Sequence, residues 1–315
     1  MLGRTAANLY WMSRYMERAE NMARLLEVGY RISLMPSLSE GHRNEWRSTL
    51  RSAGCEASFN AAHEDLTAQN VIQHLLFDET NPSSVRCAVR TARDNGRSVR
   101  TALTRDVWEC LNDTWNELSQ FKPGRFTASE LPVLFGWIKQ RSLLFRGAIM
   151  GTQLRNDIFV FSQLGSFLER ADSTARILDV KYYILLPEVE AVGGEIDNAQ
   201  WAMVLRSVSA HRSYRWVYKD SRYRPWQVAE FLILRGEMPR SLLFCYRRIK
   251  ENLDDLERLY GAREACHATT DETFGRLRNA DMTAIFQSGL HEFIGGFIAS
   301  NTRLSSEIAT AYNFP

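Results

Sequence analysis

Two stretches rich in acids and arginines offer the best candidates for a functional site. Residues 17–28 and 169–180 lie 152 positions apart and agree at most of their positions. Their charged members are Glu17, Arg18, Glu20 and Arg24 in the first stretch and Glu169, Arg170, Asp172 and Arg176 in the second. On a helix that turns about 100° per residue, Glu17, Glu20 and Arg24 gather on one side, and their counterparts repeat the pattern.

This charged stripe supports three interpretations. In the first, an acid and an arginine four positions apart, such as Glu20 and Arg24, form ion pairs on a solvated face, worth about 0.2 to 0.5 kcal/mol each. In the second, the paired acids serve as general acids or bases on a peptide or amino-acid substrate. In the third, which we favour, the stripe is a polar cleft or an internal salt-bridge seam. Apolar residues cover more than half of each helix, and this leaves the charged stripe narrow.

A second set of candidates could bind an anion. Its members are Arg14, Asn81, Asn95, Arg97 and Arg100. Guanidinium groups suit planar oxyanions such as carboxylates and phosphates, and the segment 86–100 is rich in arginine. The simpler alternatives are a solvated helix face for the arginines and a helix cap for Asn81.

Motifs for other chemistries do not occur in the sequence. Neither form of the Gly-rich phosphate loop is present, so the chain itself is not expected to bind ATP. A carboxylate-bridged di-metal site needs two Glu-x-x-His motifs, whereas only Glu264 and His267 have this spacing, so we expect no metal and no other cofactor. There is no G-x-S-x-G elbow. The five cysteines show no C-x-x-C spacing, which argues against a disulfide framework and favours a reducing cytoplasm.

The elements that carry these residues are predicted to be helices. The chain has 315 residues, 45% of them hydrophobic and only 8 of them proline, and alternating β-branched runs are scarce. We expect helices over about 6–33, 82–99, 158–185, 239–260 and 281–312, with Pro82 and Pro239 in first turns. The net charge of +2 and the lack of a long apolar run predict binding neither to nucleic acid nor to a membrane.

The similarity of the two charged stretches extends to later landmarks. The matching pairs are Trp46 and Trp201, Leu50 and Leu205, and Pro82 and Pro239, with a separation that drifts from 152 to 157. This predicts an internal duplication of about 150 residues, with repeats at about 5–156 and 157–313. We expect one all-α domain over 1–315, a pseudosymmetric helical bundle, because half of this chain could bury only part of its surface alone. A homo-oligomer is possible.

Several motifs resemble a known family in order and spacing. They are Arg4-x-Ala6-x-Asn8-Leu9-Tyr10-Trp11-x-x-Arg14-Tyr15-x-Glu17-Arg18-Ala19-Glu20, Phe77-Asp78-x-x-Asn81-Pro82-x-Ser84, Ala92-Arg93-Asp94-Asn95-x-Arg97 and Leu168-Glu169-Arg170-Ala171-Asp172. Together they resemble the bacterial alpha-E domain family over essentially the whole chain. Ser13 and Ser166 depart from the family pattern, since a glycine and an arginine are common at these places.

The resemblance implies an all-helical protein and a set of partners. Members of the family are typically encoded beside, or fused to, a circularly permuted ATP-grasp protein that resembles a peptide or amide ligase, often with a transglutaminase-like protease. We therefore expect an accessory or binding subunit in peptide or amide synthesis or modification. An enzyme that uses the paired carboxylates and a structural helical oligomer are the alternatives.

Overall fold

The computed structural model describes residues 1–315 except 35–42, 122–123, 125, 128, 185–193 and 220–221. The described residues form fifteen α-helices and one 3₁₀ turn, and they contain no strand. The predicted all-α class is therefore confirmed. The short apolar run at Phe231–Leu234, which alone could suggest a strand, falls almost entirely in helix α11 (Pro225–Ile233).

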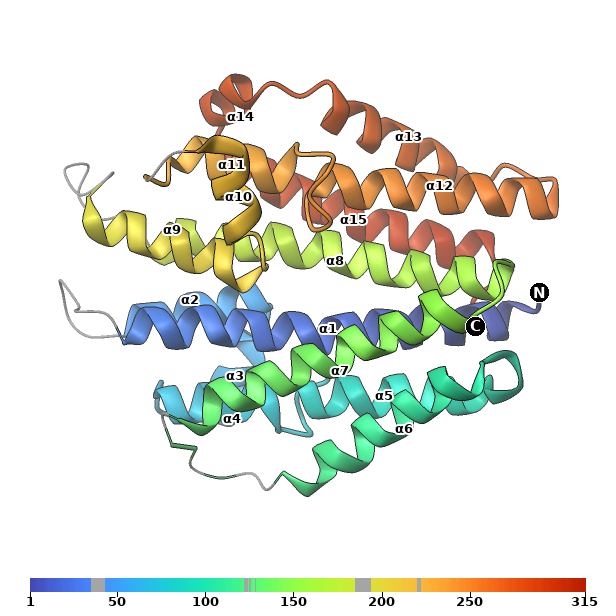
Figure 1. The fold of residues 1–315 in the computed structure, drawn as a ribbon, viewed down its shortest axis with the longest axis horizontal. Coiled ribbons are helices and arrows are strands. Elements are labelled where there is room, and N and C mark those ends of the chain that lie inside the picture. The colour runs from blue at the N-terminus through green and yellow to red at the C-terminus, as the bar shows by residue number, and fades with distance from the viewer. Residues whose placement is uncertain (35–42, 122–123, 125, 128, 185–193, 220–221) are drawn as a thin grey trace.

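Two long helices form the centre of the molecule. Helix α1 (Gly3–Ser33) and helix α8 (Asp157–Ile184) lie side by side in Figure 1, and the amino group of Met1 is 3.7 Å from the Asp157 carboxylate, so both start at the same end. Their backbones approach closely at Gly165, where an added Cβ would lie 2.1 Å from the carbonyl oxygen of Tyr10. Only glycine fits this crossing without moving a helix.

The other helices surround this pair. In the first half they are α2 (Arg43–Ala53), α3 (Glu56–Ala62), α4 (Ala68–Leu76), α5 (Val85–Ser98), the 3₁₀ turn η1 (Arg100–Ala102), α6 (Arg105–Gln120) and α7 (Glu130–Thr152). In the second half they are α9 (Glu195–Ser207), α10 (His211–Tyr218), α11, α12 (Leu242–Tyr260), α13 (Ala265–Arg278), α14 (Met282–Ser288) and α15 (Leu290–Ala311). In Figure 1, α3 to α6 lie on the α1 side of the central pair, and α12 to α14 lie on the α8 side.

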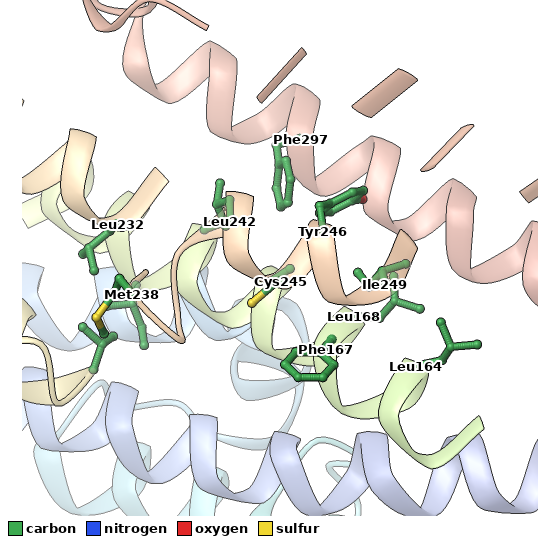
Figure 2. Packing of buried hydrophobic residues seen from close by; sticks show 14 of the residues in the cluster. Leu164, Phe167, Leu168, Leu232, Met238, Leu242, Cys245, Tyr246, Ile249 and Phe297 are labelled. Carbon is green, nitrogen blue, oxygen red and sulfur yellow. The ribbon is translucent and has the colours of Figure 1, made fainter. Parts of the chain in front are cut away.

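The buried apolar residues form two clusters, and α1 contributes to both. One cluster lies on the first-half side, among α1 to α7. The other is centred on α8, where Phe167 and Leu168 pack near Cys245 and Tyr246 of α12 and Phe297 of α15 (Figure 2). Full burial of a large apolar side chain contributes about 1.5–3 kcal/mol. These contacts hold the central helices, and any charged group between them, in place.

Two predicted helix starts are wrong by three residues. Helix α5 begins after Ser84, whose hydroxyl accepts a hydrogen bond from the N–H of Cys87, and α12 begins in the same way after Ser241. The amide oxygen of Asn81, expected to cap a helix, accepts from the N–H of Ser83 instead. The chain makes one more turn after each proline before a serine hydroxyl caps the helix by accepting from a free N–H of its first turn.

The predicted closing helix over 281–312 is also wrong in one respect. It is divided into α14 and α15 at Gly289, whose φ of 97° lies in the left-handed region that favours glycine. The polar stretch 188–198, with Gly193 and Gly194, predicts a loop, but this prediction is wrong at its end, since α9 already begins at Glu195. Pro36 and Pro187, which form a further matching pair of the predicted duplication and are expected to follow the first helix of each half, lie outside the described residues. None of the helices in the described part of the chain is long and apolar enough to cross a membrane.

Candidate functional site

The charged stripes of α1 and α8 face each other between the two helices. We call this set the charged seam: Arg14, Glu17, Arg18, Glu20 and Arg24 of α1, Arg146 of α7, Glu169, Arg170, Asp172 and Arg176 of α8, and Arg240 before α12. Glu17 is 1% exposed and Glu20 is 0% exposed. These carboxylates are therefore removed from water.

Two reciprocal ion pairs connect the stripes. Arg170 donates from Nε and Nη2 to the two carboxylate oxygens of Glu17, at 2.9 and 3.0 Å. Arg18 donates from the same two nitrogens to Glu169, at 2.6 and 3.0 Å. Each Glu-Arg dipeptide thus binds the dipeptide 152 residues away, in the two-pronged geometry that suits a planar guanidinium.

Further arginines surround the acids of α1. Arg146 Nη1 lies 2.9 Å from Glu17 Oε2 and also contacts Glu20. Arg240 Nη2 lies 2.5 Å from Glu20 Oε1 and 3.3 Å from Glu17 Oε1. Arg24, one turn along α1, lies 2.6 Å from Glu20 Oε1. Glu17 and Glu20 are therefore each held by three arginines.

Glu169 is held by arginines of α1. In addition to Arg18, Arg14 donates from Nε to Glu169 at 2.8 Å. The guanidinium of Arg14 also donates to Ser305 at 2.6 Å and stacks 4.9 Å from the ring centre of Trp11. Arg14, predicted as part of an anion site, is thus committed to the seam.

The arginines determine the ionisation of the seam. Burial by itself would raise the pKa of Glu17, but Arg170 and Arg146 outweigh it and lower that pKa to about 2. Burial likewise opposes ionisation of Glu169, and Arg18 and Arg14 lower its pKa to about 2. These carboxylates are charged at neutral pH, and their oxygens are occupied by guanidinium groups.

The seam carries more positive than negative charge. Seven arginines face four carboxylates, an excess of three positive charges. This crowding affects Arg240, which is 6% exposed, because burial and the nearby Arg24 lower its pKa to about 10. It still carries its proton at neutral pH.

One end of the seam opens into a pocket of about 250 Å³, which we call the α1–α8 pocket. Its polar lining comes from Arg18, Asn21, Ser83, Glu169, Asp172, Ser173 and Arg176. Arg176 pairs with Asp172 at 2.6 Å, and their side chains keep 31% and 17% of their surface exposed, so solvent reaches this end. Charged residues of the seam therefore line this pocket, which makes it the candidate binding site.

The remaining residues of the predicted anion site are not brought together. Asn81 is buried and donates to the carbonyl oxygen of His74. Asn95 donates to a carbonyl within α5, Arg97 is exposed in the last turn of α5, and the Arg100 guanidinium lies 5.4 Å from the ring centre of Trp108. In the described chain, none of these side chains bonds to another or to Arg14.

A metal ion has one geometrically possible site among the described residues. The ligand atoms of His63, His74 and Asp78 lie within 4.8 Å of one another. However, His74 is already hydrogen-bonded through both ring nitrogens, to Asp78 at 2.7 Å and to Ser58 at 3.0 Å. A metal would have to displace these bonds. The Glu264-x-x-His267 pair is used as a capping box at the start of α13.

Sequence reasoning missed two seam residues. Arg146 was not considered, although its position as a lone charge after Leu143-Leu144-Phe145 was an available signal. Arg240 is one of several basic residues in the sequence near α12, and nothing in its local pattern sets it apart from Arg247 and Arg248. Both come from segments distant in sequence, so the periodicity of the repeated helix could not reveal them.

Comparisons with known proteins give a family but no established activity. A family model described as a predicted alpha-helical domain with a conserved ER motif matches residues 1–312. An uncharacterised protein of Mycobacterium bovis is 24% identical over 320 residues, and one of Mycobacterium tuberculosis is 23% identical over the same length. Each match covers 94% of this chain but 35% of the relative, so the chain spans about a third of the relatives' length.

No solved structure matches the chain. The family description fits the geometry, because Glu17-Arg18 and Glu169-Arg170 are the dipeptides that form the reciprocal ion pairs. With the family model matching nearly every residue, the chain belongs to the Alpha-E family.

Proposed function

We propose that this chain is an accessory or binding subunit that works with an ATP-grasp ligase-like partner in peptide or amide synthesis or modification. The observation that carries this proposal is the state of the paired acids. Glu17, Glu20 and Glu169 are buried, ionised and held by two or three arginines each. A general base needs a carboxylate that is free to accept a proton, and a general acid needs a pKa near the working pH.

The alternative of an enzyme in its own right receives less support. Burial raises the pKa of the thiol groups of Cys55 and Cys110 and raises the pKa values of Cys245 and Cys266 to about 12. A cysteine nucleophile is the thiolate, which these environments disfavour. Asp172 is the acid of the seam with most access to solvent, and we treat it below as a binding group.

A surface for the partner is suggested by helix α7. Its exposed large apolar residues are Val133, Leu143, Leu144 and Met150, and Leu154 follows just after the helix ends. The other side of α7 packs on α1 (Figure 1). From that side Arg146 reaches Glu17 in the seam. Contiguous exposed apolar surface marks protein interaction sites more often than scattered apolar residues do. We propose that the ligase-like partner covers this side of α7.

The identity of the partner rests on the family resemblance. In the mycobacterial relatives, about two thirds of each chain lies outside the matched region, so the matched region is joined there to further sequence. This supports a role in which the present chain works together with another protein. A transglutaminase-like protease is a further possible partner, on the same resemblance. The apolar side of α7 does not itself distinguish between these proteins.

The test is whether the purified chain forms a complex with the purified ATP-grasp ligase-like protein encoded beside it. Size-exclusion chromatography with light scattering measures the mass of the complex. We expect a stable complex, lost in Leu144→Glu. Leu259→Glu on α12 is the matched control, since Leu144 and Leu259 are 56% and 55% exposed. Absence of a complex with the unaltered chain would refute the proposal. Self-association of the chain alone that Leu144→Glu abolishes would favour the structural oligomer instead.

We also propose that the two halves arose by internal duplication. The support is the order of the helices and the reciprocity of the ion pairs. Helices α1, α2 and α5 have counterparts in α8, α9 and α12, and residues 152 apart make matching bonds across the seam. In this proposal the two ends of the seam began as equivalent sites.

A further inference from the structure

The two ends of the seam share their construction. At one end, Arg24 Nη1 donates to the carbonyl oxygen of Ser207, the last residue of α9. At the other, Arg176 Nη1 donates to the carbonyl oxygen of Ser52, near the end of α2, at 3.4 Å. Each arginine also pairs with the acid four positions before it. The same side chains therefore occupy the same places at both ends.

One position differs in a way that matters. Helices α5 and α12 both begin after a capping serine, Ser84 and Ser241. The residue just before the cap is Ser83 at one end and Arg240 at the other. Ser83 lines the α1–α8 pocket, whereas Arg240 extends into the corresponding space at the other end.

The contacts of Arg240 indicate which chemical group fits the space that corresponds to the α1–α8 pocket. Its guanidinium lies between Glu20, Glu17 and Asn21, at 2.5, 3.3 and 3.5 Å. The residues 152 positions later are Asp172, Glu169 and Ser173, and all three line the pocket. The pocket is thus lined by counterparts of the three groups that hold a guanidinium at the other end.

An unused acceptor on a residue that lines the pocket supports this reading. Ser173 is 3% exposed, and its hydroxyl oxygen has no hydrogen-bond partner among the described residues. Its counterpart Asn21 accepts from Arg240. A buried polar group without a partner destabilises the chain, so a ligand that supplies an N–H donor here recovers that loss.

The volume of the pocket and the composition of the other end of the seam are compatible with a small cation. A volume of about 250 Å³ has room for roughly eight water molecules at about 30 Å³ each. Around Glu17 and Glu20 there are four arginines, Arg24, Arg146, Arg170 and Arg240. Around Glu169 and Asp172 there are three, Arg14, Arg18 and Arg176. One cationic ligand group would bring the pocket to the composition that the other end already has.

We propose that the α1–α8 pocket binds a small molecule through a guanidinium group, which takes the place that Arg240 fills at the opposite end of the seam. Asp172 and Glu169 provide the negative charge, and the Ser173 hydroxyl accepts a hydrogen bond. If the ligand also carries a carboxylate, Arg18 and Arg176 can donate to it. The hydrogen bonds described above use Nε and Nη2 of Arg18 and Nε and Nη1 of Arg176, which leaves Nη1 of Arg18 and Nη2 of Arg176 for the ligand. The proposal goes beyond the accessory role and does not depend on the ligase-like partner.

Isothermal titration of the chain alone tests the ligand class. The probes are arginine, agmatine, which lacks the carboxylate, and citrulline, which replaces the guanidinium with a neutral group of similar shape. We expect one site per chain for arginine and agmatine, and at least about tenfold weaker binding of citrulline, because a charged hydrogen-bonded pair is lost. Citrulline binding as well as arginine, acetate or inorganic phosphate binding in preference to both cations, or no binding of any probe at millimolar concentration would each overturn the proposal.

Two variants test the location. Ser83→Arg places an arginine where Arg240 stands at the other end, so we expect it to abolish arginine binding without lowering the midpoint of urea unfolding. Ser119→Arg, which adds the same charge at an exposed position of α6, is the control and should bind like the unaltered chain. Ser173→Ala should weaken binding about tenfold without lowering the midpoint of urea unfolding of the unliganded chain. Unaltered affinity in Ser83→Arg or in Ser173→Ala would place the ligand elsewhere and refute this assignment.

Discussion

The substitution Glu17→Gln measures how much the charged seam contributes to stability. It keeps the size of the side chain and removes its charge, leaving Arg170, Arg146 and Arg240 without their shared carboxylate oxygens. Removal of one partner of a buried ion pair costs about 3–5 kcal/mol. The pKa gives a second route to the same magnitude. A fall from 4.5 to about 2 corresponds to about 3 kcal/mol, at about 1.36 kcal/mol per tenfold change.

The assay is urea unfolding at neutral pH, followed by circular dichroism. We expect Glu17→Gln to lower the free energy of unfolding by about 3 kcal/mol. The control is Glu251→Gln, which breaks an ion pair with Arg248 on the surface of α12, where the acid is 46% exposed. An exposed pair of this kind contributes about 0–1 kcal/mol. Equal losses in the two variants would show that the seam does not stabilise the fold and would refute the reasoning from burial.

Three further predictions concern pH, packing and metal content. Because the pKa of Glu17 is lower in the folded than in the unfolded chain, its contribution to the free energy of unfolding is complete above about pH 4.5 and is lost as the pH falls toward 2. In urea unfolding, the difference in stability between the unaltered chain and Glu17→Gln should therefore shrink over this range. A difference that stays constant would contradict this prediction. Gly165→Ala should destabilise strongly because the new methyl group meets the Tyr10 carbonyl, whereas Gly147→Ala, in open space on α7, should stabilise by about 0.5–1 kcal/mol; similar thermal midpoints would disprove the close crossing. Elemental analysis of the purified chain should find no stoichiometric transition metal, because His74 is hydrogen-bonded through both ring nitrogens, and a bound ion that His63→Ala releases would show this expectation to be wrong.

The sequence was sufficient for the helical class and for the residues of the two stripes. Helical periodicity depends on neighbours three or four positions away, so the stripe that contains Glu17, Glu20 and Arg24 can be recognised from local spacing alone. The favourable pairs four positions apart, Glu20 with Arg24 and Asp172 with Arg176, are present as ion pairs. Boundaries were less predictable, as at Ser84, where a capping serine starts α5 three residues later than expected from Pro82.

The tertiary structure decided which groups meet. The reciprocal pairs between Glu17 and Arg170 and between Glu169 and Arg18 join residues 153 and 151 positions apart, and they exist because Gly165 lets α1 and α8 approach closely. Local spacing carries no information about such distant partners. The sequence by itself could therefore show that the two stripes are alike. Only the packing of the segments before α5 and α12 determines that Arg240 fills one end of the seam and that the other end is open as a pocket.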